Sequence, residues 1–163
     1  MEARRVNRAH VITVSDGVAA GTRQDTSGPA LQNLLRNAGF EVSGPEVVPD
    51  ERVRIADAIT AAVNGGADFV VTTGGTGLGP RDVTPQATAE LLDYEIPGLG
   101  ELMRLAGTAS TPMAAISRGL AGVRGQALIL NTPGSMKGAS ESLEAVLPVL
   151  GHAIQLLHGD TNH

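Results

Sequence analysis

The sequence contains no cysteine and no tryptophan, and it has only one tyrosine and two phenylalanines in 163 residues. Without cysteine the chain has no disulfide framework, no thiolate metal site and no cysteine nucleophile. So few aromatic side chains argue against a surface on which nucleic-acid bases stack. The 12 basic and 17 acidic residues give a net charge of −5, which argues against general binding to nucleic acids or to anionic membranes.

Long apolar runs are also missing. No segment approaches the twenty apolar residues that a transmembrane helix needs. The N-terminal stretch MEARRVNRAHVITV lacks the apolar core and cleavage site of a signal peptide, so we expect a cytoplasmic protein. The length suits a single domain over residues 1–163, with flexible ends at 1–8 and 159–163.

What the sequence does have is a regular alternation of apolar runs and helical patterns. Strands are predicted at 9–15, at 40–48 with an interruption at Gly44-Pro45, at 68–73, and twice within 114–134. Helices are predicted after Gly28 and over 51–64, 84–92, 97–107 and 138–158, and Thr84 is expected to be the N-cap of the third. This order predicts an α/β fold: a three-layer α/β/α domain with a mainly parallel central sheet.

In such sheets ligands bind at the carboxyl ends of the strands, so the loops 15–28, 49–51, 74–82 and 131–135 are the candidates. GGTGLGPRDVTP (74–85) carries four glycines directly after an apolar strand. It is not a P-loop, because Pro80-Arg81 stand where Lys and Ser or Thr are required, and it also lacks the dinucleotide G-x-G-x-x-G pattern. The loop is predicted to cradle a phosphate with its backbone N–H groups. The alternative is that the glycines only permit a tight turn.

Two acids stand out beside this loop. Asp50 and Asp82 could hold Mg²⁺, which binds through one or two carboxylates together with phosphate oxygens. The alternative is that each acid only stabilises a helix N-terminus. Asp25 and Ser27 are expected to cap the helix that follows them. The four histidines are expected to be structural, and no histidine lies where it could activate Ser117.

These residues resemble a known family. VSDGVAAGTRQDTSGPAL, VVPDE, TTGGTGLGPRDVTPQAT, ISRGLAGVRGQALILNTPGS and LPVLGHAIQLL are similar, in this order, to the molybdopterin adenylyltransferases of the MogA/MoaB family, which includes the gephyrin G domain. The resemblance runs from about residue 9 to residue 158. It implies a MogA-like fold, a homotrimer, and the transfer of an adenylyl group from Mg-ATP to molybdopterin with release of pyrophosphate. It also implies a transient contact with a molybdenum-insertion enzyme.

The resemblance places site residues one by one. Its catalytic acids fall on Asp50 and Asp82, which are also the magnesium candidates, and its pterin-binding serine falls on Ser117. The other positions expected to bind substrate or nucleotide are Ser15, Asp16, Gly74, Gly75, Thr76, Gly77, Arg81, Asn131, Pro133 and Gly134. Two alternatives remain open. One is a silent paralogue that binds molybdopterin without adenylylating it. The other is a different enzyme of the same fold, such as a molybdenum-insertion domain or a protein of the competence-damage type.

Overall fold

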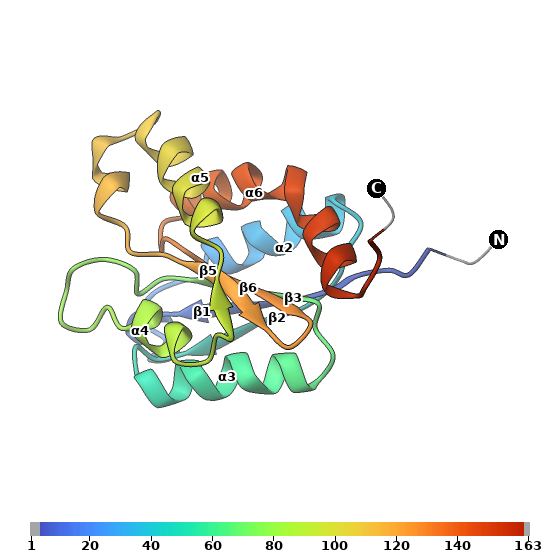
Figure 1. Ribbon diagram of the computed structural model, residues 1–163. Coiled ribbons are helices and arrows are strands. Elements are labelled where there is room, and N and C mark those ends of the chain that lie inside the picture. Colours follow the sequence, from blue (N-terminus) through green and yellow to red (C-terminus); the bar gives the residue numbers. More distant parts are fainter. Residues whose placement is uncertain (1–3, 162–163) are drawn as a thin grey trace.

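The computed structural model describes residues 4–161 as one six-stranded sheet between two layers of helices (Figure 1). The strand order is β2-β1-β3-β6-β5-β4. The strands are β1 (Arg8–Val14), β2 (Glu41–Val48), β3 (Phe69–Thr73), β4 (Tyr94–Glu95), β5 (Ala121–Arg124) and β6 (Ala127–Thr132). The first four strands in this order are parallel, and β5 and β4 extend the sheet with antiparallel pairings. The predicted α/β fold with a mainly parallel sheet is confirmed.

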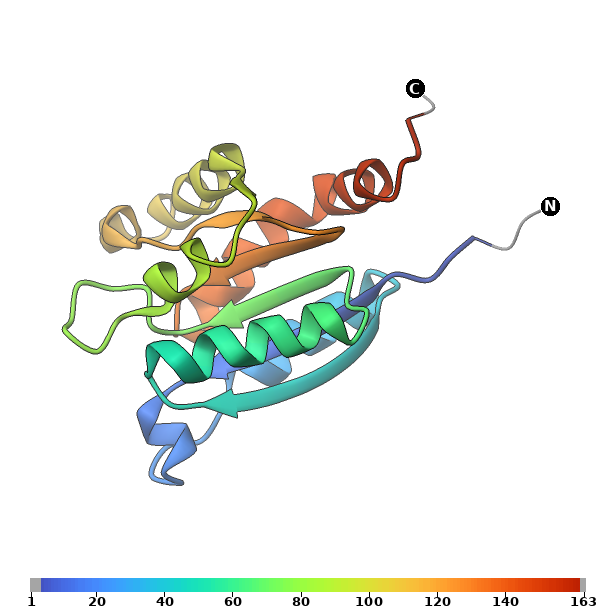
Figure 2. The ribbon, with the colours of Figure 1, turned by 60° about the horizontal axis from the view of Figure 1, so that its bottom comes forward.

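Helices cover both faces of the sheet. One face carries α2 (Ser27–Asn37), α5 (Pro97–Thr108) and α6 (Met136–Leu157), and the other carries α3 (Arg52–Asn64) and α4 (Thr84–Ala89), as Figures 1 and 2 show. Side chains of a strand alternate between the faces, so Phe69 and Val70 enter two different cores. All five residues of β3 are buried, because a central strand with helices on both sides has no solvent-facing position.

Most predicted elements agree with the structure to within a few residues, including α6, which runs through Pro148. Three short elements were not predicted: α1 (Asp16–Ala19), β4, and the 3₁₀ helix η1 (Pro112–Ile116). β4 has only two residues, which pair with Val123 and Gly122 of β5. Two residues carry no detectable alternation, so only the tertiary pairing makes this segment a strand.

Thr84 is not the N-cap of α4, as was predicted. Val83 occupies the cap position and Thr84 is the first helical residue. The Thr84 hydroxyl instead donates to the carbonyl oxygen of Gly74 at 3.0 Å, so the buried side chain ties the helix to the glycine loop. A threonine before a proline is a good cap in sequence terms, but here a long-range carbonyl competes for its hydroxyl group.

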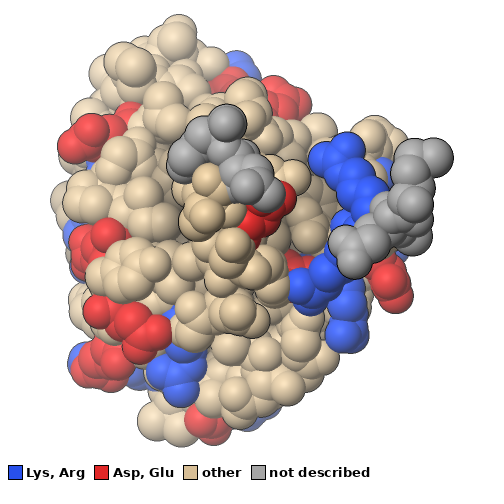
Figure 3. All heavy atoms as spheres, turned by 45° about the vertical axis from the view of Figure 1, so that its right-hand side comes forward, with Lys and Arg blue, Asp and Glu red and all other residues tan. Residues whose placement is uncertain are grey.

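Asp68, a buried acid whose side chain is 3 % exposed, lies at the amino end of β3. Its Oδ2 accepts the backbone N–H of Arg8 at 2.7 Å, and its Oδ1 lies 2.8 Å from Arg5 Nη2 and 2.9 Å from His158 Nε2. Figure 3 views the molecule from this side, where basic side chains gather at the right-hand edge of the view. Both carboxylate oxygens of Asp68 therefore have partners.

The predicted flexible ends are described only in part, since residues 1–3 and 162–163 lie outside the described residues. Arg8, in the predicted end 1–8, already belongs to β1. Whether these ends are flexible, and whether residues 1–163 make up a single domain, remain predictions. Over residues 4–161, none of the helices combines the length and the apolar character required to cross a membrane.

Candidate functional site

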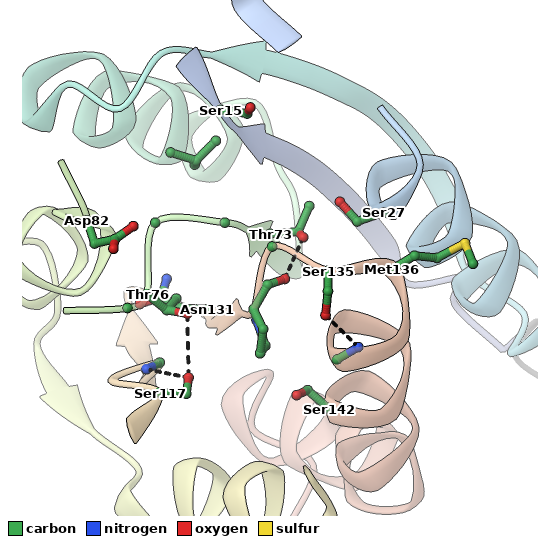
Figure 4. A pocket seen from close by; sticks show the side chains of 18 of the residues that line it. Ser15, Ser27, Thr73, Thr76, Asp82, Ser117, Asn131, Ser135, Met136 and Ser142 are labelled. Atoms are coloured by element: carbon green, nitrogen blue, oxygen red, sulfur yellow. Dashed lines mark hydrogen bonds between the residues drawn. The ribbon is translucent and has the colours of Figure 1, made fainter. Parts of the chain in front are cut away.

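A cavity of about 680 Å³ opens at the carboxyl ends of β1, β3 and β6 (Figure 4). Its walls come from the loops after these strands, the first turns of α2 and α6, and the segment from α5 through η1. The predicted site residues that line it are Ser15, Asp50, Gly74, Gly75, Thr76, Gly77, Asp82, Ser117, Asn131, Pro133 and Gly134. Asp16 and Arg81 do not line it. The roles assigned to all these residues remain predictions.

The glycine loop after β3 can be built only with glycine at its first two positions. Gly74 and Gly75 have φ angles of 107° and 70°, a region that side chains disfavour. A Cβ atom on Gly74 would lie 2.1 Å from the carbonyl oxygen of Val14, and one on Gly75 would lie 2.2 Å from Thr84 Oγ1. The glycines are therefore needed for tight packing as well as for ligand access.

This packing leaves a row of backbone donors free. The N–H of Gly74 donates to the Thr132 carbonyl at 3.1 Å, but the next three N–H groups, of Gly75, Thr76 and Gly77, have no hydrogen-bond partner in the described chain. Consecutive free N–H groups beside a cavity are the feature that binds an anion. The arrangement favours the predicted phosphate cradle over a merely structural turn.

Asp50 and Asp82 share one pattern of hydrogen bonding. Asp50 Oδ2 accepts the N–H of Asp16 at 2.8 Å, and Asp82 Oδ2 accepts the N–H of Gly79 at 2.9 Å. Between Arg4 and Thr161, no hydrogen bond reaches the Oδ1 atom of either acid, and no basic side chain forms an ion pair with either. Each carboxylate thus keeps one oxygen atom for something outside the chain.

The charges around Asp50 also favour binding of a cation. Burial raises the pKa of the Asp50 carboxyl group above its ordinary value of 3.8, and the negative charges of Asp16 and Asp82 raise it further. The hydrogen bond from Asp16 and the charge of Arg81 act in the opposite direction. A site whose acids repel one another and lack a basic partner stabilises an added cation.

These two acids fit a magnesium ion. No group of three or more His, Cys, Asp or Glu side chains is placed to hold a metal in the described part of the chain. Of the acids that line the cavity, Asp50 lies beside Gly75 and Asp82 beside Gly77 of the glycine loop. Mg²⁺ commonly takes one or two carboxylates and completes its shell with water and substrate phosphates. The pair beside an anion cradle meets that requirement.

Asp16 and Arg81 form an ion pair at the rim instead of contacting the cavity. Arg81 donates from Nη2 to Asp16 Oδ1 at 2.9 Å and from Nε to Oδ2 at 3.0 Å. The hydrogen bond from Arg81 lowers the pKa of the Asp16 carboxyl group, and the backbone N–H of Asp50 lowers it further. Arg81 is thus occupied by a carboxylate, although the sequence suggested that it would bind a substrate anion.

Arg118 also acts on the protein itself. Its Nε donates to the carbonyl oxygen of Gly77 at 2.9 Å, and its Nη2 donates to that of Asp82 at 2.7 Å. The guanidinium group thereby holds both ends of the segment between the glycines and the acid. The neighbouring Ser117 hydroxyl does line the cavity, where it accepts the N–H of Gly119 at 3.3 Å and lies 3.5 Å from Thr76 Oγ1 (Figure 4).

Asn131 is fully buried and braces the layer beneath the loop. Its Nδ2 donates to Thr72 Oγ1 and to Thr88 Oγ1, both at 3.0 Å, so it links β6, β3 and α4. Its Oδ1 is the one buried side-chain N or O atom without a hydrogen-bond partner in residues 4–161. The sequence placed Asn131 in the site but gave no sign of this bracing role.

Sequence reasoning missed the wall made by α5 and η1. Met103, Arg104, Met113 and Ile116 line the cavity, and Arg104 Nη1 donates to the carbonyl oxygen of Gly119 at 2.9 Å. In the sequence these residues belong to an ordinary amphipathic helix and the segment after it, so no motif marks them. The expected capping of α2 is present for Asp25 only in part: Thr26 occupies the N-cap position, and Asp25 Oδ1, one residue before it, accepts the N–H of Gly28 at 3.0 Å. Ser27 is the first helical residue and not the cap.

Comparisons with known proteins point to one family. Residues 10–152 match the family model described as "Probable molybdopterin binding domain". The chain is 39 % identical over 156 residues to the molybdopterin adenylyltransferase of Helicobacter pylori strain J99, covering 92 % of this chain and 87 % of that protein. It is 57 % identical to the crystal structure of the molybdopterin biosynthesis enzyme MoaB from Thermus thermophilus, with a TM-score of 0.89 and coverage of 94 % and 98 %.

Other relatives are longer than this chain. It is 39 % identical over 153 residues to a molybdenum cofactor biosynthesis bifunctional protein of Chlorobaculum tepidum, covering 94 % of this chain and 49 % of that protein. A bifunctional protein of Synechococcus elongatus is covered to 47 %. The chain thus spans about half the length of these curated relatives.

Proposed function

Because the chain belongs to the molybdopterin-binding domain family, we propose that it is a molybdopterin adenylyltransferase of molybdenum cofactor biosynthesis, a nucleotidyltransferase. In the proposed reaction a phosphate oxygen of molybdopterin attacks the α-phosphorus of ATP. The bond from that phosphorus to the bridging oxygen breaks, pyrophosphate leaves, and adenylyl-molybdopterin is formed. The proposal covers the MogA/MoaB-type activity that the sequence resemblance implies.

One observation carries this proposal: free backbone donors and half-satisfied acids share one cavity. The N–H groups of Gly75, Thr76 and Gly77 suit phosphate oxygens, and Asp50 and Asp82 suit the cation that accompanies a nucleotide. A site that only bound a pterin would have little use for a desolvated carboxylate such as Asp50 beside a second acid. This combination favours the enzyme over the silent paralogue.

The residues mainly align and screen charge. Both substrates carry phosphate groups, and a phosphate oxygen is already ionised near neutral pH, so the attack needs little help from a base. The glycine-loop N–H groups would hold a phosphate oxygen as charge builds on it. Ser117, which lines the cavity, would bind the pterin. The first turn of α6, capped by Ser135, also lines the cavity and would favour an anionic group of a substrate.

Asp50 and Asp82 would hold the magnesium ion through their Oδ1 atoms. Bound there, the ion would supply positive charge that neutralises ATP phosphate oxygens. Hydrogen bonds from Asp16 and Gly79 hold each Oδ2, so neither carboxylate has to reorganise when the ion binds.

We also propose that the protein works as a cytoplasmic homotrimer. Large apolar side chains are exposed on α5 and η1, including Leu105 at 71 %, Met113 at 65 % and Ile116 at 52 %. An exposed apolar patch of this kind suits a subunit interface. Light scattering should give three times the 16.7 kDa chain mass, and a monomer at micromolar concentration would contradict the proposal. The adenylylated product would then pass to a molybdenum-insertion enzyme by a transient contact.

The activity is tested directly by incubating the purified protein with molybdopterin, Mg²⁺ and ATP radiolabelled at the α-phosphate. We expect label to appear in the pterin and unlabelled pyrophosphate to be released in equal amount. Binding of molybdopterin with neither product, in a protein with a native melting curve, would instead establish the silent paralogue.

A further inference from the structure

We propose that Asp16 is a positioning residue that, with Arg81, fixes the orientation of the Asp50 carboxylate without touching either substrate. The inference rests on the proposed function, because it assigns a task to residues around the proposed metal-binding acid. It replaces the substrate-binding role that the sequence suggested for both residues.

A single carboxylate joins three loops here. Asp16 follows β1, Asp50 follows β2, and Arg81 lies in the loop after β3. The Asp16 Oδ1 atom accepts both the backbone N–H of Asp50 at 2.9 Å and Arg81 Nη2 at 2.9 Å, while its Oδ2 accepts Arg81 Nε at 3.0 Å. The first two loops are therefore bonded through Asp16, and Arg81 attaches the third.

The bond between the two aspartates is reciprocal. Asp50 donates its backbone N–H to the Asp16 side chain, and Asp16 donates its backbone N–H to Asp50 Oδ2 at 2.8 Å. Two hydrogen bonds between the same two residues fix both their separation and their relative rotation. Asp50 Oδ2 is held by this pairing, and Oδ1, the oxygen atom that would meet a cation, is left free.

The pair lies at the rim and does not line the cavity. Asp50 lines the cavity, whereas Asp16 and Arg81 do not, and their side chains are 44 % and 61 % exposed at the rim. The paired hydrogen bonds also occupy two of the nitrogen atoms with which Arg81 could bind phosphate. Both residues reach the site only through Asp50.

The test compares three variants with a matched control. Asp16→Ala removes both acceptors. Asp16→Asn keeps an oxygen for the Asp50 N–H but loses the charge, and Arg81→Gln removes only the outer partner. The control is Glu90→Gln, which removes the exposed ion pair between Arg52 and Glu90. Neither of these two residues lines the cavity.

We expect kcat to fall in a graded series. Asp16→Ala should lose about 100-fold, the scale of a misplacement of about 1 Å in an active site. Asp16→Asn and Arg81→Gln should lose less than about tenfold, since exposed ion pairs contribute little. The KM for ATP should change little in all three variants, and Glu90→Gln should match the wild type. An increase in the KM for ATP at saturating Mg²⁺ with unchanged kcat would overturn the proposal, because it would show a contact with the nucleotide that does not act through the metal-binding acid.

Amide hydrogen exchange gives a readout that does not depend on activity. The Asp50 N–H should exchange faster in Asp16→Ala and stay protected in Asp16→Asn, while the Asp82 N–H, bonded to the Gly79 carbonyl, serves as the unaffected reference. Unchanged protection of Asp50 in Asp16→Ala would refute the positioning role. If the variants showed the expected exchange pattern but the wild type showed no adenylyl transfer, the proposed function would fail and the positioning of Asp50 would stand.

Discussion

The two ends of the parallel sheet differ in how their acids are bonded: Asp68 at one end is buried, and Asp50 and Asp82 at the other are half-buried. At the amino ends of the strands, Asp68 has partners on both oxygen atoms: the Arg8 N–H, Arg5 and His158. At the carboxyl ends, Asp50 and Asp82 each have one backbone N–H and one oxygen without a partner in the described residues. All three acids lie beside backbone donors, yet only Asp68 also has a basic partner.

This difference separates an acid with complete bonding from the two acids that we propose to be functional. A buried carboxylate that is fully hydrogen-bonded and ion-paired stabilises the fold and has no capacity left for a ligand. A carboxylate with a free oxygen and no cation costs stability in the free protein, and binding of a cation offsets that cost. Four substitutions or titrations test this contrast, in decreasing order of the change we expect.

The largest effect is expected for Asp82→Asn. The amide oxygen can still accept the Gly79 N–H, so folding should be near native, but the charge that would hold magnesium is lost. Turnover should fall by roughly 100-fold or more, the scale of losing one preorganised electrostatic group. Thermal melts and adenylyl transfer at several Mg²⁺ concentrations measure both properties. Wild-type turnover in this variant would show that the charge of Asp82 is not needed for the reaction.

Asp68→Asn should show the reverse pattern. It keeps the shape of the side chain but removes the ion pair with Arg5. The amide NH2 group, which replaces one carboxylate oxygen, can no longer accept a hydrogen bond. We expect the free energy of unfolding to fall by about 1–3 kcal/mol, at the lower end because Arg5 is 56 % exposed. Urea unfolding measures this loss. Turnover per folded molecule should match the wild type, and a large loss of turnover would contradict the structural assignment.

Ser117→Ala tests the carboxyl end with a neutral group. If the hydroxyl binds the pterin, its removal should weaken molybdopterin binding by about 1 kcal/mol and leave ATP binding nearly unchanged. Titration calorimetry with each ligand separates the two. Thr108→Ala, which removes a hydroxyl on α5 that donates to the Leu105 carbonyl outside the cavity, is the matched control. Equal weakening of both ligands by Ser117→Ala would indicate a disturbed fold and would contradict a pterin contact.

The smallest effect concerns pH. The pKa of Asp50 is raised by burial, so on acidification it takes up a proton at a higher pH than an ordinary aspartate of pKa 3.8. Magnesium affinity should therefore begin to fall at a pH above the one an unshifted carboxylate would give. The sign for folding is opposite: the unfolded chain ionises first, so the Asp50 contribution to stability falls as pH rises from about 3.8 to the raised value and is constant above it.

Calorimetric titration with Mg²⁺ and ATP at stepped pH measures the first part of this prediction. Asp50→Asn supplies the control for the second, because it removes the desolvated charge and retains an oxygen for the Asp16 N–H. Its melting temperature at neutral pH should be at least that of the wild type. A lower melting temperature would mean that the Asp50 charge stabilises the fold, as that of Asp68 does.

Much of the site was predictable because it consists of loops after apolar strands. GGTGLGPRDVTP indicates a turn that only glycine can make, and its position after β3 places it at the carboxyl edge of the sheet. The bonding of individual side chains was not predictable in this way. Thr84 looked like a cap and bonds Gly74, Arg81 looked like an anion ligand and bonds Asp16, and Asn131 braces Thr72 and Thr88.

Local sequence pattern was enough to predict most of the strands and helices in their order, the α/β class and the four loops in which a ligand could bind. These follow from periodicity, from glycine and proline, and from the rule that parallel strands present their carboxyl ends together. The closure of the cavity by α5 and η1, and the full bonding of Asp68 but not of Asp50 and Asp82, emerged only in the folded chain. A hydrogen bond between distant residues depends on positions set by the whole packed molecule, and local pattern does not encode those positions.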